Sequence, residues 1–176
     1  MSKLKAMIRY FASHTEPELL GKKKLMKLFY FTDFCHVKKY AAPITYDNYV
    51  HLEHGPIPST ILNLVSAVES DKDDSILGDV LKIEMRDGSN MKRIITYKTF
   101  SDQDKEYLNN TELKILDEVC KKFFSSTGKN IEDASHQEAG WLMTRELESI
   151  PYTLAVNDSD CLVDKEDIET LLEISK

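Results

Sequence analysis

The sequence has little cysteine, and its cysteines form neither a disulfide framework nor a zinc site. Cys35, Cys120 and Cys161 are odd in number, widely spaced and without a CxxC pair. This usage fits a reducing compartment, so we expect a cytoplasmic protein. The sequence also lacks an apolar leader at its N-terminus and any run approaching the roughly 18 apolar residues of a membrane span. We therefore expect no export and no membrane partner.

Positive charge is also scarce. The chain has 23 Lys and Arg against 30 Asp and Glu, which gives a formal net charge of −7. Nucleic-acid binding depends largely on basic residues that displace counterions from phosphates. The charge balance therefore argues against DNA or RNA as a partner.

Motifs that carry chemistry are missing as well. There is no Gly-rich phosphate loop, G-x-S-x-G elbow, Walker-type motif or H-E-x-x-H pair. His51 and His54 have a spacing seen in ligand pairs, but zinc needs three or four donors, so a strand histidine beside a turn histidine is the competing interpretation. Cys35 and His36 are adjacent on a predicted helix and point about 100° apart, which argues against a nucleophile and its base.

We therefore predict no catalytic residues, no metal and no cofactor. An enzyme whose active site is assembled from separate loops remains the alternative.

The length of 176 residues, with 41% apolar and 30% charged residues, predicts one globular domain that spans residues 1–176. Apolar residues at helical spacing and local caps predict helices near residues 3–13, 22–42, 58–70, 112–124 and 164–175, and a helical run from 131 that bends near Gly140. Thr111, Asn130 and Asp164 are the predicted N-caps, and Gly128 the predicted end of the fourth helix.

Two regions read as extended chain. Residues 44–53 are rich in Ile, Thr, Tyr and Val, and residues 79–86 and 91–98 flank an Asp-Gly turn at 87–90. Two alternatives are open: the hairpin and the strand near residue 50 form a small antiparallel sheet, or the hairpin stands alone. The predicted fold class is α+β and mainly helical, with a central apolar helix packed by the other helices and a small antiparallel sheet or hairpin.

The predicted helix over residues 22–42 is apolar around most of its circumference, so we expect it in the middle of the domain. Its narrow polar stripe holds Lys24, Lys27 and Lys38, with Phe31 among them. Phe31 is either an exposed anchor for a protein partner or a core residue covered by another helix, with lysine stems around it. Asp33, between apolar neighbours, is expected to be buried and to tie the helix to a loop backbone.

Three segments in order carry a family resemblance: KLMKLFYFTDFCHVKKY at residues 24–40, HGPIP at 54–58 and ASHQEAGW at 134–141. Together they resemble the Panacea (SocA-like) antitoxin domain family over about residues 5–150. The positions that match the family pattern are Lys24, Leu25, Lys27, Leu28, Tyr30, Phe31, Gly55, Pro56, Ser135, His136 and Trp141.

The resemblance implies a non-enzymatic antitoxin that neutralises a cognate protein toxin, encoded by the adjacent gene, by direct binding. Two alternatives are an adaptor that delivers its partner to an ATP-dependent protease and a phage- or prophage-associated regulator without a toxin. Net negative charge suits a basic toxin.

Within the motifs, we expect one set of residues to serve as scaffold and another to meet the partner. The expected scaffold residues are Leu25, Leu28, Tyr30, His54, Gly55, Pro56, His136 and Trp141, with Trp141 packed near His136. The expected partner-binding residues are Lys24, Lys27, Phe31 and Lys38, together with the loop at 71–75.

Overall fold

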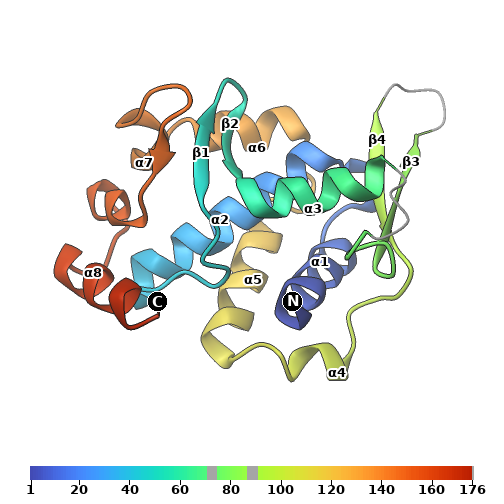
Figure 1. The fold of residues 1–176 in the computed structure, drawn as a ribbon, viewed down its shortest axis with the longest axis horizontal. Coiled ribbons are helices and arrows are strands. Elements are labelled where there is room, and N and C mark those ends of the chain that lie inside the picture. The colour runs from blue at the N-terminus through green and yellow to red at the C-terminus, as the bar shows by residue number, and fades with distance from the viewer. Residues whose placement is uncertain (71–74, 87–90, 176) are drawn as a thin grey trace.

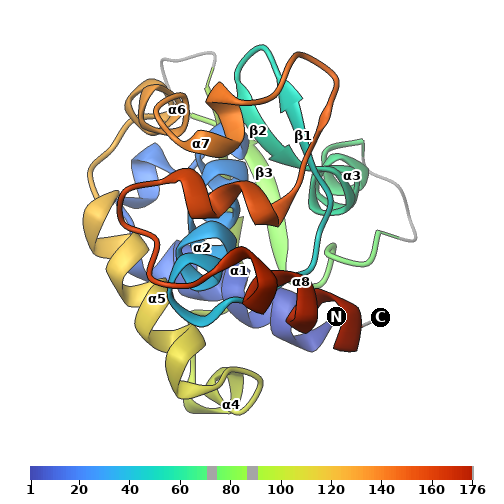
Figure 2. The same cartoon turned by 90° about the vertical axis from the view of Figure 1, so that its left-hand side faces the viewer.

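The central helix α2 (Lys22–Tyr40) runs through the middle of the molecule, and the other elements surround it (Figures 1 and 2). The computed structural model describes residues 1–70, 75–86 and 91–175. The fold is α+β and mainly helical, as the sequence predicts. The remaining helices are α1 (Ser2–His14), α3 (Ser59–Glu69), α4 (Asp102–Lys105), α5 (Asn110–Lys122), α6 (Gly128–Ser135), α7 (Ala139–Leu142) and α8 (Lys165–Ile174), with 3-10 turns η1 (Pro17–Leu19) and η2 (Tyr152–Asn157).

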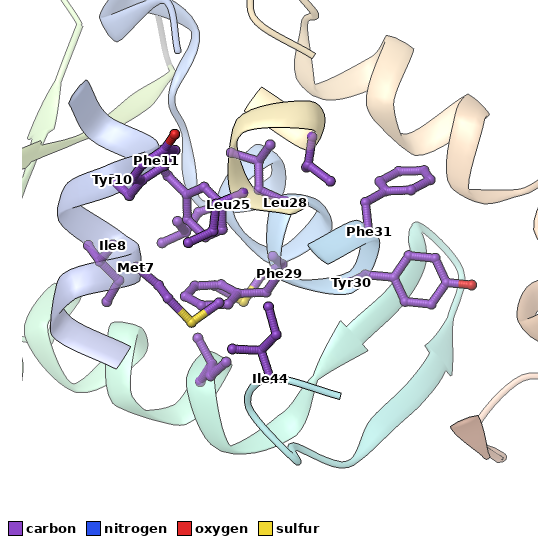
Figure 3. Close-up of a cluster of buried hydrophobic side chains, with 14 of the residues drawn as sticks. Met7, Ile8, Tyr10, Phe11, Leu25, Leu28, Phe29, Tyr30, Phe31 and Ile44 are labelled. Atoms are coloured by element: carbon purple, nitrogen blue, oxygen red, sulfur yellow. The ribbon is translucent and has the colours of Figure 1, made fainter. Parts of the chain in front are cut away.

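The apolar residues of α2 face neighbours on several sides. Phe29 packs edge-to-face on Phe11 of α1, with ring centroids 5.0 Å apart, and Met7 and Ile44 lie beside it (Figure 3). Tyr30 points to the opposite side of the helix, away from α1 (Figure 3). Because core side chains surround α2 in this way, its position fixes where the other helices can pack.

Two small antiparallel sheets form. The strands β2 (Gly55–Pro58), β1 (Tyr49–Leu52) and β5 (Ser149–Ile150) pair in that order, and β3 (Leu81–Met85) pairs only with β4 (Lys92–Thr96) among the described strands. The hairpin does not join β1, because β2 and β5 occupy both edges of β1 and no edge remains for it. The other alternative, a hairpin that pairs on its own, is the one that the structure shows. The predicted Asp-Gly turn at 87–90 lies outside the described residues.

The HGPIP segment contributes a strand as well as a turn. Gly55 to Pro58 pair with β1 in the register Tyr49 to Pro58 and Leu52 to Gly55. β2 is an edge strand of this sheet. Proline lacks a backbone N–H and is tolerated at such an edge.

Two of the predicted helix caps are wrong. Asn109, not Thr111, caps α5: its side chain accepts a hydrogen bond from the Glu112 N–H at 2.9 Å, and the Glu112 carboxylate accepts from the Asn109 N–H at 2.8 Å. This capping box satisfies two N–H groups at once, whereas Thr111 lies inside the first turn.

The predicted cap of α6, Asn130, is also too late in the sequence. Thr127 caps α6 by accepting from the Asn130 N–H at 3.2 Å, so Asn130 is inside the helix. Gly128 begins α6, while α5 has already ended at Lys122. Asp164 occupies the N-cap position of α8, as predicted, without a hydrogen bond from its side chain.

Asp33 ties α2 to the loop before β1, as the sequence predicts. One carboxylate oxygen accepts from the Ile44 N–H at 2.8 Å and the Thr45 N–H at 2.9 Å. The other accepts from the Thr45 hydroxyl and from the Tyr49 hydroxyl at 2.9 Å. Burial raises the pKa of Asp33, and these hydrogen bonds act against that rise.

Replacing Asp33 by alanine leaves two backbone N–H groups and two hydroxyls without their acceptor in the core. We expect Asp33→Ala to lower the free energy of unfolding by about 3–5 kcal/mol in urea titrations. Asp133→Ala removes an exposed carboxylate that pairs with Lys129 on the helix surface, and should change stability by less than about 0.5 kcal/mol. Equal losses in the two variants would contradict an anchoring role for Asp33.

Candidate functional site: where the three motif segments meet

The three motif segments, distant in sequence, converge beside α2. Lys27 is completely buried, and its amine donates a hydrogen bond to the carbonyl oxygen of Pro56 at 2.8 Å. This contact joins the first motif segment to the second. Leu25, Leu28 and Tyr30 are also completely buried, which confirms that these three are core residues.

Gly55 is the point of closest approach. Its backbone has φ of +95°, and a Cβ added there would lie 2.7 Å from both the Lys27 amine and the Ser135 hydroxyl oxygen. Only glycine provides this conformation and this clearance without strain. Ser135 belongs to the third motif segment, so this segment also approaches Gly55. The Ser135 hydroxyl itself donates to the Glu132 carbonyl oxygen at 2.7 Å.

Trp141 makes a second set of contacts in this cluster of motif residues. Its ring stacks on His136, as expected, with centroids 4.2 Å apart, and also on His51 of β1 at 3.5 Å. Burial lowers the pKa of both histidines, so the rings stack as neutral imidazoles at neutral pH. Next to Trp141, a Cβ added at Gly140 would lie 2.9 Å from the Tyr30 hydroxyl, so α7 rests directly on α2.

His51 and Gly140 complete this cluster, although no sequence pattern indicates their role. The sequence offers two interpretations of His51, a metal ligand beside His54 or a strand histidine beside a turn histidine, and His51 lies in the strand β1. His54 is exposed and lies 3.6 Å from a carboxylate oxygen of Glu132. Within the described ranges, no group of three or more His, Cys, Asp and Glu is placed to hold a metal ion.

Burial gives Lys27 an unusual protonation equilibrium. Burial lowers the pKa of its amine from 10.5 to about 7, a change that Glu132 opposes and Lys23 reinforces. An amine of this pKa has the basicity of a catalytic lysine. The Lys27 side chain has no exposed surface, however, and its hydrogen bond holds β2 against α2. Its role in this arrangement is that of a structural donor.

The lysine stripe of α2 is inside the protein, so the expectation of an exposed stripe is wrong. The Lys24 amine donates to the carbonyl oxygen of Phe124 at 2.9 Å, and Phe31 packs on Phe123 with centroids 4.5 Å apart. The Lys24 stem and the Phe31 ring are buried, and both meet the chain just after α5. The alternative interpretation, in which another helix covers Phe31, is the one that the structure shows.

Lys38 is buried too, and it gathers carboxylates from the C-terminal part of the chain. Its amine lies 2.5 Å from Glu138, 2.9 Å from Asp158 and 3.0 Å from Asp160. Burial lowers the pKa of Lys38, but these three partners outweigh burial and raise it above its ordinary value. Lys38 therefore stays charged and fastens the C-terminal segment to the end of α2. Of the loop expected at 71–75, residues 71–74 lie outside the described residues.

The thiols of Cys35 and Cys120 are poor nucleophiles at neutral pH. Burial raises the pKa of Cys35 to about 11 and that of Cys120 to about 12. A thiol reacts as its thiolate, which both values make scarce.

A family model described as "Antitoxin SocA-like, Panacea domain" matches residues 25–142, about two-thirds of the chain. The match includes Lys27, Gly55 and Ser135, the residues that bring the three segments together. No curated protein and no solved structure matches the chain. Within the described residues, no helix has the length and apolar character needed to cross a membrane.

The close approach at Gly55 can be tested by adding one methyl group. Gly55→Ala forces a Cβ into the Lys27 amine and the Ser135 hydroxyl at a positive φ, so we expect a loss of at least about 2 kcal/mol in the free energy of unfolding. Gly128→Ala is the matched control, because its Cβ would meet only the Lys23 side chain at 3.5 Å. The control should change stability by less than about 1 kcal/mol. A harmless Gly55→Ala would contradict the close approach.

The depressed pKa of Lys27 predicts a pH dependence of stability. The unfolded chain holds a proton on Lys27 up to its ordinary pKa of 10.5, whereas the folded chain releases it near 7. Between these values the unfolded state binds more protons, so wild-type stability should rise relative to Lys27→Met, by up to about 1.4 kcal/mol per pH unit. Below about pH 7 the difference should be constant. Urea titrations of both proteins from about pH 6 to 9 measure it, and a flat difference throughout would exclude the depressed pKa.

Proposed function

The chain belongs to the Panacea family of SocA-like antitoxins, and on that premise we propose that it neutralises a protein toxin by binding it directly. The toxin is encoded next to the antitoxin and is the partner with which it copurifies. The encounter takes place in the cytoplasm, in keeping with three free cysteines. The family match over residues 25–142 is the observation that carries this proposal.

The interior of the domain supports a role in binding rather than in chemistry. The motif residues Lys27, Gly55 and Ser135 contact one another's segments inside the protein. They hold a scaffold together and leave the surface to meet the partner. The net charge of −7 favours a basic toxin, because opposite charges speed the encounter and disfavour wrong partners.

Delivery of the toxin to an ATP-dependent protease is a second mode of neutralisation, suggested by the SocA-like description of the family. It begins with the same binding step and differs in the fate of the bound toxin. Occlusion leaves the half-life of the toxin unchanged or longer, whereas delivery shortens it. The half-life of the toxin with and without this chain therefore separates the two modes.

Co-expression tests the proposal. The protein from the adjacent reading frame should arrest growth when expressed alone and be harmless when expressed with the wild-type chain. Asp33→Ala, which should destabilise the domain, is expected to protect less well than the wild type. Affinity purification of the wild-type chain should recover the adjacent protein in a stoichiometric complex. A non-toxic neighbour that does not copurify would refute the proposal and favour a regulator without a toxin.

A further inference from the structure

The negative charge of the protein is concentrated at one end of the chain. Residues 143–176 hold 9 acidic and 3 basic residues, a net charge of −6, whereas residues 1–142 hold 21 acidic and 20 basic residues, a net charge of −1. The exposed acidic residues of this segment are Glu146, Glu148, Asp160, Asp164, Glu166, Asp167, Glu169 and Glu173. With η2 and α8, the segment covers one side of the molecule, the side that faces the viewer in Figure 2.

An apolar group lies where this acidic segment begins, at the end of α7 and on the loop that joins α7 to β5. Leu142, Met143 and Leu147 are exposed by 66%, 56% and 75% of their surface, and the partly buried Trp141 precedes them. Exposed large apolar side chains gathered on one loop are typical of surfaces that bind proteins. We name residues 141–148 the acidic-apolar loop, because Glu146 and Glu148 lie among these side chains.

The acidic-apolar loop is held in place by hydrogen bonds to β1 and to α7. The Leu147 N–H donates to the His51 carbonyl oxygen at 2.8 Å, and the His51 N–H donates to the Glu148 carbonyl oxygen at 2.9 Å. The Thr144 hydroxyl donates to the Gly140 carbonyl oxygen at 2.7 Å. A loop that is already ordered loses little conformational entropy when a partner binds, so its exposed side chains are effective contacts.

Leu147 has a backbone conformation that does not suit leucine. Its φ is +69°, in the left-handed region, where a residue with a Cβ other than Asn or Asp is strained by roughly 1–2 kcal/mol. Its side chain is exposed and gains little from packing within the chain. Glycine or asparagine would serve the fold better at this position. A strained residue that displays an apolar side chain to solvent indicates a use for that side chain.

Charge decides which occupant fits this surface. A second copy of the chain would set one segment of net charge −6 against another, and nucleic acids and anionic membranes would be repelled in the same way. A basic protein segment with apolar side chains satisfies both features. Resting on the proposed function, we propose that the acidic-apolar loop is the docking surface for a Lys- or Arg-rich, partly apolar segment of the toxin.

The conformation of Leu147 allows a variant that should bind the toxin more weakly than the wild type without any loss of folding stability. Asparagine tolerates positive φ, so Leu147→Asn should keep or raise the melting temperature while it removes the apolar contact. The affinity for the purified protein of the adjacent reading frame, measured by titration calorimetry, should fall by about 10-fold or more. Ile174→Asn is the matched control, because Ile174 is also 75% exposed and lies in the same acidic segment. Its affinity should equal that of the wild type.

A second pair of variants tests the charge. Glu146→Lys and Glu106→Lys change the net charge equally, but Glu106 is exposed in the connection between α4 and α5. Stopped-flow association at about 0.05 M salt should be several-fold slower for Glu146→Lys than for Glu106→Lys, and the difference should vanish near 0.5 M salt. Equal rates for the two variants would show that charge at the loop does not guide the encounter, and would overturn the proposal.

The outcomes separate this inference from the proposed function. If the wild-type chain does not bind the adjacent protein, the proposed function and the docking surface are both refuted. If it binds and Leu147→Asn binds equally well, or loses no more affinity than Ile174→Asn, the docking surface is wrong while the antitoxin function stands. Sedimentation of the chain alone gives a further check: a wild-type dimer that Leu147→Asn dissociates would make the loop a self-association surface and overturn the proposal.

Discussion

The need to satisfy four charged groups buried on α2 determines much of this structure. A buried charge without a partner costs several kcal/mol, so Lys24, Lys27, Asp33 and Lys38 each require one. The partners come from different parts of the chain: the carbonyls of Phe124 and Pro56, the loop at 44–49, and the carboxylates of Glu138, Asp158 and Asp160. Each of these interactions sets the position of a different segment against the same helix.

This constraint explains why the family pattern is found in the interior. Lys27 reaches the Pro56 carbonyl only because Gly55 leaves room for its amine, and Ser135 shares that room. Trp141 stacks between two histidine rings, next to the point where α7 rests on α2. These residues hold the domain in one arrangement. In our proposal, recognition of a partner falls to residues that the arrangement brings to the surface, such as those of the acidic-apolar loop.

Local patterns predicted the helices well and the long-range pairings poorly. Apolar periodicity located α1, α2, α3 and α8 to within a few residues, because a helix is stabilised by contacts between near neighbours. The sequence left open whether the hairpin joins β1, since strand order depends on which segments reach an edge first. The caps of α5 and α6 were misplaced because several nearby residues can cap a helix, and hydrogen-bond geometry selects one.

The sequence by itself determined that the chain is a mainly helical α+β protein, that α2 is its central helix, that Asp33 is buried and bonded to a loop backbone, and which family the chain resembles. Only the tertiary structure decided that the lysine stripe of α2 is interior and that Leu142, Met143 and Leu147 are exposed together at the end of α7 and on the loop after it. A helical wheel shows that a stripe is polar, but it does not show whether another segment supplies hydrogen-bond or ion-pair partners for that stripe. The acceptor of Lys24 lies 100 residues away in sequence, and that of Lys27 lies 29 away. Burial of a charged side chain depends on such distant partners, and no local pattern contains them.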